Sequence, residues 1–216
     1  MITIDKKALK AMSFLAAKDD VRYYLNGIYV EYGPMETRLV ATNGHVLGIH
    51  RSDAKGENDE SAIGNLIIPN EAVKSMCAWK TDKHIHTITL KPLNEGATEF
   101  RADYCGNNIV FSPTDGKYPH YRKVFPQKVS GKTAQFDAQY LYALSKTAET
   151  LLDKKHKKAY MHIGHNGDGG ALVELCGVEN FIGVIMPICA DDEVIPVSAP
   201  AWALAQLEIP AIAIAA

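Results

Sequence analysis

The sequence has few of the features that mark secreted, membrane or metal-binding proteins. Only 4 of its 216 residues are cysteines, and Cys77, Cys105, Cys176 and Cys189 lie far apart with no C-x-x-C pair. This spacing predicts reduced thiols rather than a disulfide framework or a zinc site. No apolar run approaches the ~20 residues of a membrane span, and the N-terminal segment has no signal-peptide core. We therefore expect a cytoplasmic protein with no membrane partner.

An excess of charge of one sign is also missing. The chain has 23 Lys and Arg residues against 25 Asp and Glu residues, which gives a formal net charge of -2 at pH 7. This balance excludes a generally basic nucleic-acid binder, so any contact with nucleic acid must come from a local basic surface. The length and the hydrophobic content of 47% are those of a globular protein with one or two domains.

Motifs of catalysis and metal binding are missing as well. The sequence has no paired-carboxylate site, nucleophile elbow or phosphate loop. His84 and His86 would share one face of a strand, but the sequence offers no third metal ligand. The letters HIGH at residues 162–165 match a signature of class I aminoacyl-tRNA synthetases, yet they lead into a turn between two expected strands. We expect no enzyme activity, no cofactor and no metal, with an enzyme on a borrowed scaffold as an alternative.

Two hairpin signals are the clearest local features of the chain. A Gly-Pro pair at residues 33–34 separates two β-rich runs, and an Asn-Gly pair at residues 43–44 is typical of two-residue turns with φ > 0. Together they predict three consecutive strands. The second turn brings together, at one end of the sheet, Thr42, His45 and Leu47. These three side chains either pack in the core or line a groove.

One sequence unit occurs three times along the chain. The segments ITIDKKALKAM, LIIPNEAVKSM and AQFDAQYLYAL begin at residues 2, 66 and 134, at intervals of 64 and 68 residues. Each combines a β-rich run with apolar positions at helical spacing, and strand-like runs follow it. We expect the first helix to end near residue 18, the second near residue 80, and the third unit to begin with a strand at 134–136. The repeat predicts an α+β fold with helices on one face of antiparallel sheets.

A proline-containing segment over residues 116–127 is the expected domain boundary. It divides the chain into residues 1–126 and residues 127–216. A fourth unit is expected to start near residue 197 and to remain incomplete.

Lysines recur on the predicted helices. Lys10 and Lys74 occupy equivalent helical positions, Lys6 and Lys7 lie beside the first, and Lys146 lies on the third helix. Such a surface is either simply solvated or contacts the phosphates of duplex DNA without reading bases. Nearby carboxylates dilute the positive charge, so we expect binding to DNA to be weak and salt-sensitive.

Several separated segments of the chain resemble the bacterial DNA polymerase III beta subunit, the sliding clamp. They are RYYLNGIYVE, LVATNGHVLGIH, NLIIPNEAVKSM, FSPTDGKYPHYRKVFP and FIGVIMPI. The resemblance begins with that family's middle domain, is good to about residue 126 and is weaker through residue 188. It implies a DNA-clamp fold and a role in DNA replication as a processivity factor. Its groove would receive Q-L-type peptides of DNA polymerases, clamp loaders and repair proteins.

Carried over by position, the resemblance implies a peptide-binding groove built from distant segments. Its residues would be Arg22, Leu25, Thr42, Gly44, His45, Leu47, Pro119, Lys123, Val124, Met186, Pro187 and Ile188. Val46 stands where the family usually has a basic residue, which predicts a less polar wall.

The sequence departs from the family in two ways. The family chain has three domains of two units each and closes a ring as a dimer, whereas here the first domain and half of the last have no counterpart. A homo-oligomer is expected, with ring closure left open. The alternative is a non-ring adaptor or decoy that binds clamp-binding peptides without encircling DNA. The tail, residues 190–216, contains QLEI at 206–209, and it either completes the fourth unit or occupies a groove.

Overall fold

The fold is described from a computed structural model of the chain. The described residues are 1–54, 58, 63–94, 96–152, 159–188, 199–200 and 203. Within them no helix combines the length and apolar character needed to cross a membrane. The QLEI segment of the tail lies outside these residues. So does most of the fourth unit that is expected from residue 197 on.

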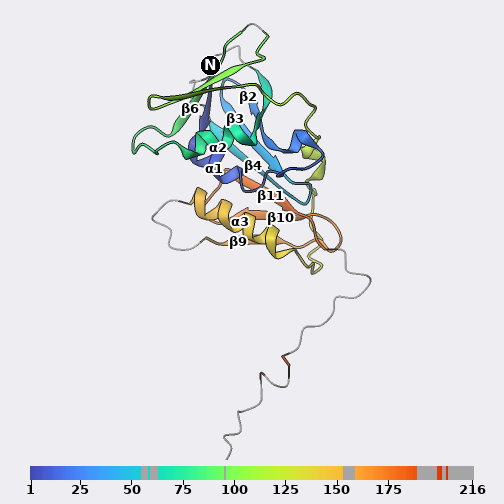
Figure 1. Cartoon of the computed structure of the whole chain (residues 1–216). Helices are drawn as coiled ribbons and strands as arrows, with labels where there is room; N and C mark the ends of the chain where they lie inside the picture. The colour runs from blue at the N-terminus through green and yellow to red at the C-terminus, as the bar shows by residue number, and fades with distance from the viewer. Residues whose placement is uncertain are drawn as a thin grey trace, which may run out of the picture.

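Three successive units make up the described chain (Figure 1). The first contains β1 (Ile2–Asp5), α1 (Lys6–Met12), η1 (Tyr23–Leu25), β2 (Gly27–Tyr32), β3 (Glu36–Thr42) and β4 (Val46–Asp53). The second contains β5 (Gly64–Pro69), α2 (Asn70–Ala78), β6 (Thr87–Pro92), β7 (Phe100–Tyr104) and β8 (Asn107–Phe111). After η2 (Tyr121–Val124), the third contains α3 (Ala138–Leu151), β9 (Met161–Gly164), β10 (Ala171–Leu175) and β11 (Phe181–Ile185). The predicted α+β class is confirmed.

Two of the predicted helix ends were wrong. The first helix ends at Met12 instead of near residue 18, because the chain tightens there into turns in which Phe14 and Leu15 donate to carbonyls three residues back. The second helix ends at Ala78 instead of near residue 80, because Trp79 adopts an extended ψ of 142°. The apolar periodicity continues past the first helix since Leu15 is buried in the core from a turn.

Two of the predicted β features also differ. The turn between β3 and β4 has two central residues, but these are Gly44 and His45 and not Asn43 and Gly44. Thr42 lies opposite Leu47, and the Asn43 N–H donates to the Val46 carbonyl at 3.3 Å. The Asn43 side chain closes the turn by accepting from the backbone N–H groups of His45 and Val46. The expected strand at residues 134–136 is not formed. In the first two units each such strand pairs with a strand of the other unit, and no described strand is available to residues 134–136.

The strands form two antiparallel sheets that the units share. One sheet has the order β1-β6-β7-β8, and the other has the order β5-β2-β3-β4-β11-β10-β9. Thus β1 of the first unit pairs with β6 of the second, and β5 of the second pairs with β2 of the first. The pairing of β4 with β11 joins the third unit to the first, from Phe181 opposite His50 to Ile185 opposite Val46.

The three helices pack on the sheets through one shared core, and α1 lies between α2 and α3 (Figure 1). The positions that coincide in the sequence repeat are buried together. Ile4 and Ile68, and then Met12 and Met76, are at most 1% exposed. Burial of these apolar side chains on the sheets is the main force that holds the helices in place.

A buried histidine makes the stability of this core depend on pH. His50 on β4 is 5% exposed, and burial lowers its pKa from the ordinary value to about 4. Because the unfolded chain binds the proton more tightly, this contribution to stability is full at neutral pH and is lost as pH falls from about 6.5 toward 4. From pH 7.5 to pH 5 we expect the free energy of unfolding to fall by about 2 kcal/mol through this group.

Urea denaturation at the two pH values measures this loss, with the His50→Leu variant as the matched control. The variant should lose less stability than the parent over the same interval. Equal losses in the two proteins would contradict the assignment to His50.

Candidate functional site

A cavity of about 350 Å³ opens where the first and third units meet. Its lining residues are Arg22, Leu25, Thr42, Gly44, His45, Val46, Leu47, Pro119, Tyr121, Val124, Val184 and Met186. They come from η1 and η2 with the residues just before them, from the β3–β4 turn with the strand ends that flank it, and from the end of β11. Most of this lining is aliphatic or aromatic, with Arg22, Thr42 and His45 as its polar side chains. Such a mixture is typical of pockets that bind an apolar ligand group and fix its orientation.

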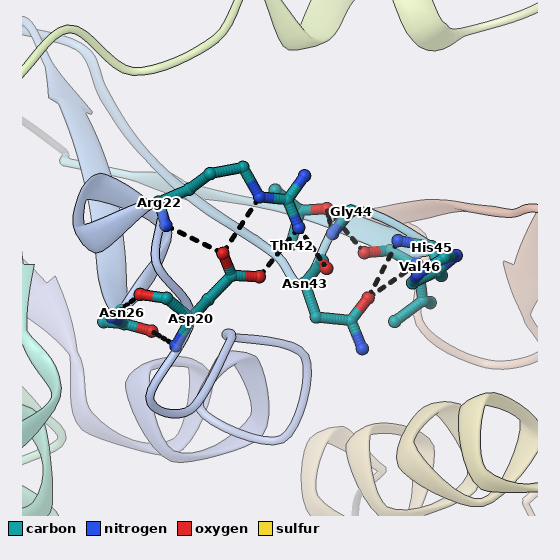
Figure 2. Close-up of polar contacts among 8 residues, drawn as sticks. All are labelled: Asp20, Arg22, Asn26, Thr42, Asn43, Gly44, His45 and Val46. Atoms are coloured by element: carbon teal, nitrogen blue, oxygen red, sulfur yellow. Dashed lines mark hydrogen bonds and ion pairs between the residues drawn. The ribbon is translucent and has the colours of Figure 1, made fainter.

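The turn between β3 and β4 is held by its own side chains (Figure 2). The Thr42 hydroxyl donates to the Val46 carbonyl at 2.7 Å and accepts from the Gly44 N–H at 3.0 Å. The Asn43 carboxamide oxygen accepts from the N–H groups of His45 and Val46 at 2.9 and 3.0 Å. These four hydrogen bonds fix the backbone of the turn, which forms one wall of the cavity.

Arg22 reaches this turn from the first unit (Figure 2). Its guanidinium donates to both carboxylate oxygens of Asp20, at 3.0 and 2.7 Å, and to the Asn43 carbonyl at 3.3 Å. Hydrogen bonds from the Arg22 side chain and backbone lower the pKa of Asp20 to about 2. The carboxylate therefore stays ionised at neutral pH and keeps the guanidinium at the rim of the cavity.

The third unit supplies the wall that adjoins the turn. The Met186 N–H donates to the His45 carbonyl at 2.8 Å, and the His45 imidazole stacks on Tyr140 of α3 with ring centroids 5.2 Å apart. Val124 and Met186 are 43% and 37% exposed, so their apolar groups face solvent at the cavity mouth. Exposed apolar side chains beside a cavity are typical of an interaction site.

The structure brings together nine of the twelve residues expected in the groove. These are Arg22, Leu25, Thr42, Gly44, His45, Leu47, Pro119, Val124 and Met186. Lys123, Pro187 and Ile188 do not line the cavity. Lys123 is exposed on η2, and Ile188 bonds through its N–H to the Gln135 carbonyl. Val46 does line it and is 1% exposed, in agreement with a less polar wall.

Besides Val46, two lining residues were missing from the predicted set. Val184 lies two residues before Met186, so the strand period of two places both on one face of the sheet. Tyr121 belongs to the segment FSPTDGKYPHYRKVFP, which carries part of the family resemblance, and its hydroxyl donates to Glu31 at 2.7 Å. Both could have been found from the sequence by applying strand periodicity and by reading the whole segment.

The lysines expected to face DNA do not form one free surface. Lys6 is 5% exposed, with its ammonium 3.3 Å from the Thr81 hydroxyl, so its expected place on that surface was wrong. Lys7 donates to the carbonyls of Leu151 and Leu152 at the end of α3. The other three are Lys10, Lys74 and Lys146; the first two are exposed and the third pairs with Glu149 at 2.8 Å.

A substitution at Gly44 tests the geometry of the turn that forms one wall of the cavity. Its φ of 93° is in the left-handed region, and a Cβ there would lie 2.8 Å from the Arg22 guanidinium. Gly44→Ala should therefore strain the turn by about 1–3 kcal/mol and displace Arg22. Thermal or urea unfolding measures the loss, with Gly33→Ala as the control because a Cβ at Gly33 meets nothing within 4 Å. Equal stability of the two variants would contradict the geometry.

Comparison with known proteins agrees with this architecture. The family description "DNA polymerase III beta subunit, central domain" matches residues 4–120. The beta sliding clamp of Vibrio cholerae is 29% identical over 161 residues, which are 74% of this chain and 41% of that protein. The beta sliding clamp of Pseudomonas putida is 31% identical over 154 residues, 70% of this chain and 40% of that protein.

A solved structure gives the same fold. The DNA polymerase III subunit beta of Pseudomonas aeruginosa superimposes with a TM-score of 0.64 at 18% identity, and the match covers 86% of this chain and 65% of that one. Repeated units, shared sheets and a cavity at the unit junction together define the sliding-clamp class of fold. Since the family match covers 117 of 216 residues (4 to 120), the chain belongs to the DNA polymerase III beta subunit family. It spans about two fifths of the length of these curated relatives.

Proposed function

We propose that this chain is a sliding-clamp-like processivity protein of DNA replication that tethers partner proteins through the cavity between its first and third units. The apolar cavity of about 350 Å³ is the observation that carries this proposal. Partners would be DNA polymerase, clamp-loader or repair proteins that present short Q-L-type peptides. The chain itself would position these partners and catalyse no reaction.

The cavity suits such a peptide in shape and chemistry. Leu25 and Leu47, 2% and 5% exposed, form an apolar floor for the aliphatic and aromatic side chains of the peptide. At the rim, Arg22 and His45 offer donors and acceptors to a glutamine carboxamide. Burial of one leucine-sized side chain supplies about 1.5–3 kcal/mol, and the polar rim fixes the direction of the chain.

Contact with duplex DNA is a second part of the proposal. Lys10 and Lys74 are exposed at equivalent positions on α1 and α2, where they would contact phosphates without reading bases. With a net charge of -2, the affinity for DNA should be low and should fall as salt rises. A non-ring adaptor that binds the same peptides is the alternative, and it would show peptide binding without retention on circular DNA.

Titration with a fluorescent Gln-Leu-x-Leu-Phe peptide tests the proposed function. We expect a saturable rise in anisotropy with one site per chain, and displacement by the unlabelled peptide. A peptide with alanine at both leucine positions is the control and should not compete. Absence of saturable binding, or equal competition by the control peptide, would overturn the proposal.

A further inference from the structure

The first two units complete each other by exchanging strands. β1 leaves its own unit and pairs with β6, and β5 leaves its own unit and pairs with β2. Ile4 lies opposite Ile88 in the first ladder, and Ile68 lies opposite Ile28 in the second. All four side chains are at most 1% exposed. The two pairings are equivalent, so the units are related by an approximate two-fold axis, and each needs the other's first strand.

The third unit has the internal geometry of the second. After β8, the Thr114 N–H donates to the Ile67 carbonyl of β5 at 2.9 Å. After β11, the Ile188 N–H donates to the Gln135 carbonyl at 2.8 Å. Ile67 and Gln135 both lie two residues before the helix N-cap, at Pro69 and Asp137. Residues 134–136 therefore have the position of β5 relative to their own unit.

What the third unit does not have, among the described residues, is a partner unit. The order of the larger sheet ends at β9, so the outer edge of β9 pairs with no described strand. Phe136 and Met161 are only partly buried against the core, whereas their counterparts Ile68 and Ile88 are fully buried. An open edge beside partly exposed apolar side chains is a surface that accepts another strand.

We propose that a second copy of this chain completes the third unit. Residues 134–136 of each copy pair with the β9 edge of the other, and the two α3 helices pack together as α1 packs on α2. A two-fold axis forms both ladders at once, in the way that the approximate axis of the first domain does, so the contact is closed and self-complementary. The described residues of two copies then form three domains, of which the central one is shared.

The β1–β6 ladder predicts which residues of the two copies pair with each other. Ile4 lies opposite Ile88, the first apolar residue of β6, and the first apolar residue of β9 is Met161. The same register puts Phe136 of one copy opposite Met161 of the other, and both side chains already pack against the core of their own chain. Gln135 then lies opposite His162 on the outer face. Both of these residues are exposed, the His162 side chain by 78%, so they can be changed without disturbing the core.

Molar mass in solution gives the first test. Light scattering of the full chain should give twice the 23.7 kDa of one chain, with concentration-dependent dissociation. A mass of one chain at all concentrations, as expected if the chain's own residues 189–216 cover the β9 edge, would overturn the proposal. The peptide titration is independent of this result, because the cavity lies within one chain.

Disulfide trapping tests the register. Gln135→Cys and His162→Cys are made separately in a background in which the four native cysteines are serine. Opposite Cβ atoms in an antiparallel pair are about 4.5–5.5 Å apart, a separation that a disulfide bridges after a small adjustment. On oxidation we expect a covalent dimer in the mixture of the two variants and none with either variant alone.

Asn108→Cys is the matched control. It is exposed on β8, the open edge of the other sheet, and should give no adduct alone or with His162→Cys. Circular dichroism confirms that each variant is folded. An adduct of Asn108→Cys with itself would place the interface at β8, and a mixture of folded Gln135→Cys and His162→Cys without an adduct would exclude the register; either result overturns the proposal.

Discussion

Replacing both His45 and Met186 by alanine is expected to weaken binding of a Gln-Leu-x-Leu-Phe peptide by about 2 kcal/mol or more, close to 30-fold. The two residues line the cavity from neighbouring strand ends, which are joined by the hydrogen bond from the Met186 N–H to the His45 carbonyl. Truncating both removes the thioether that would cover an apolar peptide side chain and the imidazole at the rim. The backbone bond between the walls is unaffected, so the cavity should keep its shape.

Anisotropy or calorimetric titration of the double variant measures this loss. Val110→Ala is the matched control, because Val110 is 53% exposed on β8, away from the cavity. Since His45 also stacks on Tyr140 of α3, unfolding curves of each variant separate a lost contact from a lost fold. Unchanged affinity of a stably folded double variant would remove both residues from the peptide site.

Leu144→Ala should lower the free energy of unfolding by about 2–5 kcal/mol. Leu144 is 0% exposed on α3, inside the core cluster that joins the first and third units. One turn away, the Thr147 hydroxyl donates to the Ala11 carbonyl of α1. A cavity at this place removes apolar contacts between the two units, and the helix cannot collapse into it while α1 and the sheet hold their positions.

Urea denaturation measures this loss, with Tyr142→Ala on the same helix as the control. Tyr142 is 64% exposed, so its removal should change stability by much less. If the two variants were equally stable, α3 would not pack on the first unit as described.

The repeat could be predicted from the sequence because it depends on local patterns. Apolar side chains at helical spacing, such as Leu9 and Met12, had to face one sheet whatever its strand order. The helix end at Met12 could not be predicted in the same way. Leu15 keeps the apolar periodicity while the backbone has already left the helix, and the turn is decided by tertiary bonds of Ala17 to Leu25 and Thr42.

The site was predicted in pieces, and its assembly depends on a contact that no local pattern contains. β4 and β11 are separated by more than a hundred residues, and their pairing brings Met186 to His45. Local sequence patterns predict where the strands lie, but they do not predict which two strands pair. The buried Lys6 was missed for a related reason, because the contacts of its ammonium with Thr81 and Tyr104 come from the second unit.

The most direct test of the account is to locate the bound peptide by NMR of methyl-labelled protein. Adding the Gln-Leu-x-Leu-Phe peptide should shift the methyl signals of Leu25, Leu47, Val124, Val184 and Met186 together, with one common affinity. Methyl signals on the far sheet, such as those of Val110, should stay in place. Shifts confined to other surfaces, with these five unchanged, would contradict a peptide site at the junction of the first and third units.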